Sequence, residues 1–129
     1  MYLADPVDAD VVVDEADHWA FEGTGLRPGD RLPGLLGYEV DAVAAGSPPG
    51  LHRLAHSPFT RGSGEIEHAD MTIHESPAGA LVFATGSMSW NWGLDGYNAP
   101  RLHPDRVSAA AQRITRNVLA RMLQDRARK

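Results

Sequence analysis

The sequence predicts an α/β or α+β fold, with a small mixed sheet of four to six strands and one long C-terminal helix packed on it. Residues 80–84 form an unbroken apolar run, which is typical of a strand buried on both faces. Residues 51–59 and 65–76 also read as strands, and their turn-sized connections favour antiparallel pairing. Residues 104–126 repeat apolar side chains at helical spacing, which predicts the helix.

Length and composition limit the class of protein. With 129 residues, of which 43% are hydrophobic, the chain is expected to form a single domain over residues 1–129 with a real core. No apolar run approaches the ~20 residues of a membrane span, and we expect no membrane partner. Residues 1–6 do not resemble a secretory signal. The absence of cysteine excludes disulfides and thiolate sites, and a cytoplasmic location is the default expectation.

The charge is acidic overall and unevenly distributed. Twelve Lys and Arg against 17 Asp and Glu give a net charge of −5, which argues against nucleic-acid binding. Residues 1–103 hold 15 acidic and 5 basic side chains, whereas residues 104–129 hold 2 and 7. The basic segment either lies on an acidic body, its own or a partner's, or is a solvated face with cations near its C-terminus. The expected partner is a second copy in a homo-oligomer or another protein subunit.

The first third of the chain is predicted to be rich in loops. Residues 1–15 are expected to be poorly ordered or an edge segment, because acidic residues flank three valines that could form a short strand. Aromatic side chains alternate over residues 18–22, which predicts a half-buried strand. Residues 23–37 contain two proline turns, several glycines and four leucines, and are interpreted as an ordered loop. They open a loop-rich β region that extends over residues 16–103.

Residues 38–43 are predicted to form the next strand. Its alternation places Glu39 and Asp41 on one face. Two carboxylates on one side of a strand can bind a cation or divide acid and base roles, or they can simply face water. Residues 44–50 are a loop.

The second half supplies the clearest hairpin and a set of histidines. Residues 70–76 and 80–85, joined by a short turn, form the strongest hairpin signal. Four histidines precede the end of this hairpin, and they would gather into a metal site if their strands were neighbours: His52, His56, His68 and His74. The sequence has no helical pair of histidines at metal-ligand spacing, so surface or secondary roles are favoured and no metal ligand is assigned.

The C-terminal helix is predicted over residues 104–126. Pro104 and Asp105 suit its first turn. One apolar stripe is expected to pack on the sheet, and it contains Val107, Ala111, Ile114, Val118 and Met122. Three more residues are expected to widen this stripe: Ala110, Leu119 and Leu123.

The strand at residues 80–84 ends in Thr85-Gly86-Ser87, and large aromatic residues follow. This pattern is typical of a ligand crevice at a sheet edge, and equally of a strand that ends against a hydrophobic cap. The candidate substrate-binding residues are Trp90, Trp92 and Asp95. No catalytic residue is assigned, because no nucleophile elbow, zinc-protease or phosphate-loop motif is present.

Three segments together carry a family resemblance. They cover residues 18–26, residues 32–41 with Pro-Gly-Leu-Leu-Gly-Tyr-Glu-Val-Asp, and residues 79–95 with Ala-Thr-Gly-Ser-Met-Ser-Trp-Asn-Trp-Gly-Leu-Asp. In this order they resemble the C-terminal region of the large (beta) subunit of N,N-dimethylformamidase and its relatives, over roughly residues 15–125.

The resemblance implies a hydrolase of small linear amides. The large subunit of that family is several times longer than this chain and includes a domain similar to class I glutamine amidotransferases. Its mononuclear iron is held by tyrosine and glutamate side chains that lie upstream of the resembled region, so the cofactor ligands cannot be mapped here. Tyr38 and Glu39 have the right side chains, but neighbouring strand residues point to opposite faces.

Three hypotheses follow. The chain is a C-terminal module that lines the crevice of an amide hydrolase and is not catalytic by itself, or it is a non-catalytic module for oligomerisation or protein interaction. The third hypothesis is a small metalloenzyme that uses the histidines with Glu39 or Asp41.

Overall fold

The structure, a computed structural model, describes residues 7–126, with side chains described through residue 124. Its elements follow one another as β1 (Asp8–Val12), η1 (Trp19–Phe21), β2 (Arg31–Gly37), β3 (His52–Thr60), β4 (Ile66–Glu75), β5 (Leu81–Ala84), η2 (Met88–Gly93) and α1 (Ala109–Arg126).

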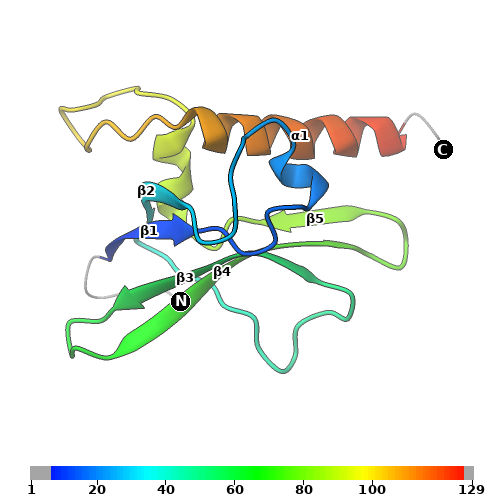
Figure 1. The fold of residues 1–129 in the computed structure, drawn as a ribbon, viewed down its shortest axis with the longest axis horizontal. Coiled ribbons are helices and arrows are strands. Elements are labelled where there is room, and N and C mark those ends of the chain that lie inside the picture. Colours follow the sequence, from blue (N-terminus) through cyan, green and yellow to red (C-terminus); the bar gives the residue numbers. More distant parts are fainter. Residues whose placement is uncertain (1–6, 127–129) are drawn as a thin grey trace.

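The predicted fold class is confirmed, because strands and one long C-terminal helix make up the structure. The strands divide into two antiparallel sheets, β1-β2 and β3-β4-β5. Figure 1 shows α1 running along one side of the molecule, with the short helices η1 and η2 between it and the strands. The core lies between these layers.

The valines near the N-terminus form β1. Val11 and Val13 are buried, and Val11 lies opposite Leu32 of β2. The Val12 N–H donates to Ser57 Oγ at 2.9 Å, which links β1 to β3. Of the segment expected to be poorly ordered or an edge, residues 1–6 lie outside the described residues, and β1 contributes to the core.

The strand predicted over residues 18–22 is wrong, because this segment is the short 3₁₀ helix η1. His18 caps it, with Nδ1 accepting from the Ala20 N–H at 3.2 Å. Ala20 and Phe21 are both buried. Neighbouring residues of a strand point to opposite faces, so a helical turn is the conformation that buries both side chains on one side.

The predictions for residues 23–43 also need correction. Residues 31–37 form β2 rather than loop, because Leu35 and Leu36 are buried and β1 pairs with this segment. Residues 38–43 do not form a strand. Tyr38 has φ 63°, a left-handed conformation that interrupts an extended chain, and Val40 makes only an isolated bridge to Ser87.

The hairpin predicted in the second half is confirmed. β4 pairs with β3 and with β5, and Thr72 lies opposite Ala84. The expected burial of the last strand on both faces is wrong, because β5 is an edge strand and Val82 is 45% exposed. Its side chains alternate between half-buried and exposed, as in a strand with one covered face.

The helix α1 begins at Ala109, five residues later than predicted. Ser108 precedes it, and its Oγ accepts from the Ala111 N–H at 3.2 Å. The stripe of Ala111, Ile114 and Val118 is buried, as predicted. Three residues assigned to the core side are instead exposed: Val107 (48%), Leu119 (55%) and Leu123 (67%). Among the described residues, no helix has the length and apolar character needed to cross a membrane.

Candidate functional site

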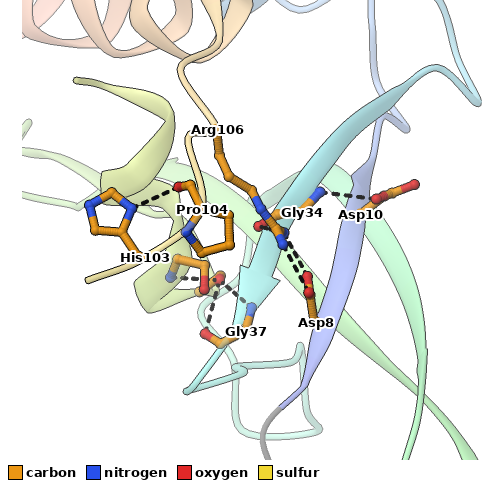
Figure 2. A network of polar contacts seen from close by, with 9 residues as sticks. Asp8, Asp10, Gly34, Gly37, His103, Pro104 and Arg106 are labelled. Carbon is orange, nitrogen blue, oxygen red and sulfur yellow. Dashed lines mark hydrogen bonds and ion pairs between the residues drawn. The ribbon is translucent and has the colours of Figure 1, made fainter. Parts of the chain in front are cut away.

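The two longest segments of the resemblance pack against each other, β2 against the residues that follow β5. The Gly37 N–H donates to Ser87 Oγ at 2.9 Å. A Cβ atom at Gly37 would collide with the Val7 carbonyl oxygen and lie 2.8 Å from Ser89 Oγ. Figure 2 shows how closely the polar groups meet around Gly37. This contact therefore requires glycine.

Gly86 makes the corresponding approach from the other segment. Its φ is 70°, and a Cβ atom there would collide with the Asp70 carbonyl oxygen of β4. The Asp41 N–H donates to the Gly86 carbonyl oxygen at 3.2 Å, which ties residues 38–43 to the end of β5. The small residues after β5 thus serve backbone packing.

Trp90 lies in the core and holds α1. Its side chain is 3% exposed, and its Nε1–H donates to Thr115 Oγ1 of α1 at 3.1 Å. On the same 3₁₀ helix, a Cβ atom at Gly93 would lie 2.7 Å from Leu35 Cδ1 and 3.0 Å from Ala111 Cβ. The helix η2 is therefore the layer between β2 and α1.

Trp92 forms an aromatic cluster with Tyr38 and His103. The Tyr38 ring meets Trp92 edge-on at 5.4 Å, and the His103 ring stacks on Trp92 at 4.8 Å with an interplanar angle of 3°. Tyr38 is half exposed and Trp92 is half-buried, so this cluster reaches the surface. Trp92 was a candidate from the sequence, whereas His103 was not, because it lies in a loop without a periodic pattern.

His103 is held by two backbone carbonyls. Its Nδ1 lies 2.8 Å from the Pro104 oxygen and its Nε2 lies 2.8 Å from the Tyr97 oxygen. Figure 2 shows the first of these bonds. These two contacts fix the orientation of the imidazole ring against the Trp92 indole.

Asp95, the third predicted substrate-binding residue, is exposed. Its Oδ1 accepts from the Tyr97 N–H at 2.8 Å, an interaction within a tight turn. The structure thus distributes the three candidates: Trp90 is in the core, Trp92 is in the aromatic cluster, and Asp95 is in a turn. Their role in substrate binding stays a prediction.

A shallow pocket of about 210 Å³ lies at the carboxyl end of β5. Its lining consists of Glu39, Asp41, Ala84, Thr85, Gly86, Ser87 and Met88. The structure therefore brings the predicted carboxylate pair to the end of this strand. The hydroxyls beside it have internal partners, since Thr85 Oγ1 donates to the Ser87 carbonyl oxygen at 3.0 Å and Ser87 Oγ bonds to Gly37.

A second pocket, of about 200 Å³, lies where β3, β4 and β5 meet η1 and α1. Its lining consists of His18, Trp19, Gly50, His52, Ile73, His74, Glu75, Leu81 and Arg121. The His18 and His52 rings are 5.1 Å apart. Burial chiefly, and the neighbouring charge of His52 next, lower the pKa of His18. Glu15 Oε2 lies 2.9 Å from His52 Nδ1 and orients that ring.

The predicted histidine cluster is divided between two places. His52 and His74 line the second pocket, whereas His56 stacks on His68 at 4.2 Å and lies 2.6 Å from Asp70 Oδ1. In the part of the chain that the structure describes, no three His, Asp or Glu side chains are grouped to hold a metal ion.

Tyr38 and Glu39 do not fit an iron site of tyrosine and glutamate. The Tyr38 ring packs against Trp92, while the neighbouring Glu39 lines the pocket at the end of β5. Because the two side chains lie in different surroundings, no step of a reaction is assigned to such a metal on this pair.

Arg106 connects the start of α1 to both strands of the first sheet. Its two terminal nitrogens contact the carboxylate of Asp8 at 2.6 and 2.8 Å, and Nη1 donates to the Gly34 carbonyl oxygen at 2.8 Å (Figure 2). Any Cβ at Gly34, whose φ is 66°, would occupy the place of the guanidinium. The hydrogen bonds from Arg106 lower the pKa of Asp8, and Asp8 in turn raises the pKa of Arg106. Arg106 was not a candidate from the sequence.

The comparison with protein families identifies the family of this chain. A family model described as N,N-dimethylformamidase beta subunit-like, C-terminal, matches residues 1–104. These residues include all five strands and both 3₁₀ helices, and α1 lies outside them. Neither the curated proteins nor the solved structures give a match.

Proposed function

This chain belongs to the N,N-dimethylformamidase beta subunit-like C-terminal family, and from that premise we propose that it is a module that completes and walls the crevice of an amide hydrolase. In this proposal it shapes the substrate site and does not carry out the reaction. The observation that carries the proposal is that the two longest family-like segments, residues 32–41 and 79–95, pack against each other. The Gly37 N–H donates to Ser87 Oγ between the two segments, and Gly86 lies against the Asp70 carbonyl oxygen of β4, so these distinctive residues have structural roles.

The aromatic cluster is the part of this surface that suits a small amide. Trp92 offers a half-buried indole face, supported by Tyr38 and His103, and the methyl groups of a small amide pack well on such rings. Trp90 supports this wall from inside the core, and Asp95 lies in the turn that follows. The groups that activate water and polarise the carbonyl would come from the remainder of the enzyme, the iron included.

The proposed partner is therefore a large subunit of the dimethylformamidase type, with its domain similar to glutamine amidotransferases. Neither nucleic acid nor a membrane is part of the proposal, and its setting is the cytoplasm. A pull-down of the purified chain with such a subunit tests the partnership, and cell fractionation tests the location.

Complementation tests the proposed role. A dimethylformamidase-type large subunit that lacks its own C-terminal region should regain hydrolysis of N,N-dimethylformamide when this chain is added. Trp92→Ala should raise KM several-fold and leave kcat little changed, because it removes a binding face and no reacting group. Trp19→Ala, an aromatic truncation outside the cluster, is the matched control.

Two results would reject the proposal. If the chain neither binds the truncated subunit nor restores its activity, the module does not complete the crevice. If Trp92→Ala and Trp19→Ala change KM equally, the aromatic cluster is not the wall that meets the substrate.

A further inference from the structure

The inner face of the helix α1 packs against the rest of the molecule. Ala111, Ile114 and Val118 are buried in the core. Asn117 Nδ2 donates to the carbonyl oxygens of Ala20 and Glu22, at 2.9 and 2.8 Å. These contacts fix the rotation of α1 about its axis and determine which side chains face outward.

The opposite side of α1 carries a second apolar surface, which we call the outer stripe: Arg116, Leu119, Ala120 and Leu123. Residues three, four and seven positions apart share one side of a helix, so these four side chains are neighbours. All four are exposed, and the two leucines are 55% and 67% exposed. Figure 1 shows the other elements on one side of α1 only.

The molecule also has a surface that suits this stripe, at the other end of α1. An open hollow of about 570 Å³ is lined by Asp8, Asp10, Pro33, Gly34, Asp105, Arg106, Val107 and Ser108. We call it the acidic hollow, because it holds three aspartates against one arginine. Figure 2 shows Arg106 bound to Asp8, and Asp10 accepting from the Gly34 N–H. Asp10 also lies 3.6 Å from Arg31 Nη1, and the exposed Asp105 accepts from the Val107 N–H through one of its two oxygens. Pro33 and the 48%-exposed Val107 add apolar surface.

We propose that α1 docks its outer stripe into the acidic hollow of a second copy of this chain. The leucines of the stripe would cover Pro33 and Val107, and Arg116 would meet Asp105. A second copy is the occupant because the chain carries both complementary surfaces: the outer stripe holds the cation Arg116, and the hollow holds three aspartates against one arginine. Pairing two outer stripes would instead bring like charges together.

The association is head-to-tail, because the two surfaces are different patches of the molecule. Such a contact extends to rings or chains rather than stopping at a symmetric dimer. Salt should weaken it, because part of the attraction acts between exposed charges. This proposal is independent of the proposed function, since neither the outer stripe nor the acidic hollow includes a residue of the aromatic cluster.

Sedimentation equilibrium of the intact chain tests the proposal. The average mass should rise with protein concentration at low salt and fall as salt is added. The variants Leu119→Ser/Leu123→Ser, in the stripe, and Asp105→Asn/Val107→Ser, in the hollow, should each raise the dissociation constant by about tenfold or more. Leu102→Ser, at a 73%-exposed leucine outside both surfaces, should associate like the unchanged chain.

Mixing the two defective variants gives the decisive result. The variant with the altered stripe keeps an intact hollow, and the variant with the altered hollow keeps an intact stripe. The mixture should therefore form dimers and nothing larger. The substituted side chains are exposed, and circular dichroism should confirm unchanged folding. The proposal fails if the intact chain stays monomeric at every concentration at low salt. It also fails if either variant associates normally, or if the mixture stays monomeric.

Discussion

The contact of β2 with the segment around η2 differs in kind from the attachment of α1. The first depends on glycines that leave no room for a Cβ atom: Gly37 lies against the Val7 carbonyl oxygen and Ser89 Oγ, and Gly93 lies against the Leu35 side chain. In the same segment, Gly86 lies against the Asp70 carbonyl oxygen of β4. The second relies on side chains, such as the hydrogen bond from Trp90 to Thr115 and those of Asn117 to η1. A position that leaves no room for a Cβ atom tolerates only glycine, whereas single side-chain hydrogen bonds can be exchanged one by one. The difference indicates that the first contact defines the module and that α1 is an adjustable cover.

The largest expected effect comes from breaking the backbone contact at Gly86. Gly86→Ala places Cβ against the Asp70 carbonyl oxygen and forces alanine into φ 70°, so we expect a loss of about 3 kcal/mol in unfolding free energy. Gly29→Ala, with φ 86° but no atom within 4 Å, should lose about 1 kcal/mol. Urea titration measures both. Equal losses would show that the close approach to β4 costs nothing.

A smaller effect is expected from the side-chain attachment of α1. Trp90→Phe and Thr115→Val each remove one partner of the buried hydrogen bond, and each should cost about 1–2 kcal/mol. In a double-mutant cycle the pair should show coupling of about 1 kcal/mol. If the two losses simply add, the hydrogen bond does not hold α1 in place.

The pH dependence at His18 tests the side-chain attachment of α1 a second time, because His18 caps η1, to which Asn117 of α1 is bonded. Burial lowers the pKa of His18 below its ordinary value of 6.5, so the unfolded chain binds the proton more readily. The contribution of His18 to the free energy of unfolding is therefore fully present above pH 6.5. It is lost as the pH falls through the lower pKa that His18 has in the folded chain. His18→Asn keeps a capping side chain and should flatten this decline in thermal melts recorded from pH 7.5 to about 5. An unchanged slope would mean that His18 titrates alike in both states.

The smallest effect is expected at Asp8, which joins the two regions through Arg106. The hydrogen bonds from Arg106 lower the pKa of Asp8 below its ordinary value of 3.8. Their contribution to the free energy of unfolding is therefore fully present above pH 3.8 and is lost as the pH falls through the pKa that Asp8 has in the folded chain. The Asp8 side chain is 68% exposed, so solvent screening should keep the effect below about 1 kcal/mol. Asp8→Asn should reduce the acid sensitivity of unfolding, and Asp17→Asn is the control. An equal reduction in the control would contradict the assignment.

Sequence periodicity predicted strands and helices correctly where one side of the element is buried along its whole length. The hairpin of β4 and β5 and the inner face of α1 have the alternation and spacing that burial on one side produces. The pattern failed at residues 18–22, because the cap at His18 stabilises a short helix that no periodicity reveals.

The candidate site was predicted only in part. Glu39 and Asp41 do reach the end of β5, but through a turn at Tyr38 with positive φ rather than along a strand. Trp92 lies at the surface as a crevice residue would, whereas Trp90 is committed to the core. The stacking of His103 and the clamp of Arg106 join residues far apart in the chain, and no local pattern encodes such contacts.

The most direct test of the account is the rate at which the purified chain alone hydrolyses formamide and N,N-dimethylformamide, with ferrous iron supplied. We expect no turnover above the uncatalysed rate, because the proposed function assigns the reacting groups to a larger subunit. Sustained turnover by the chain alone, abolished by a substitution of one of its own side chains, would contradict it.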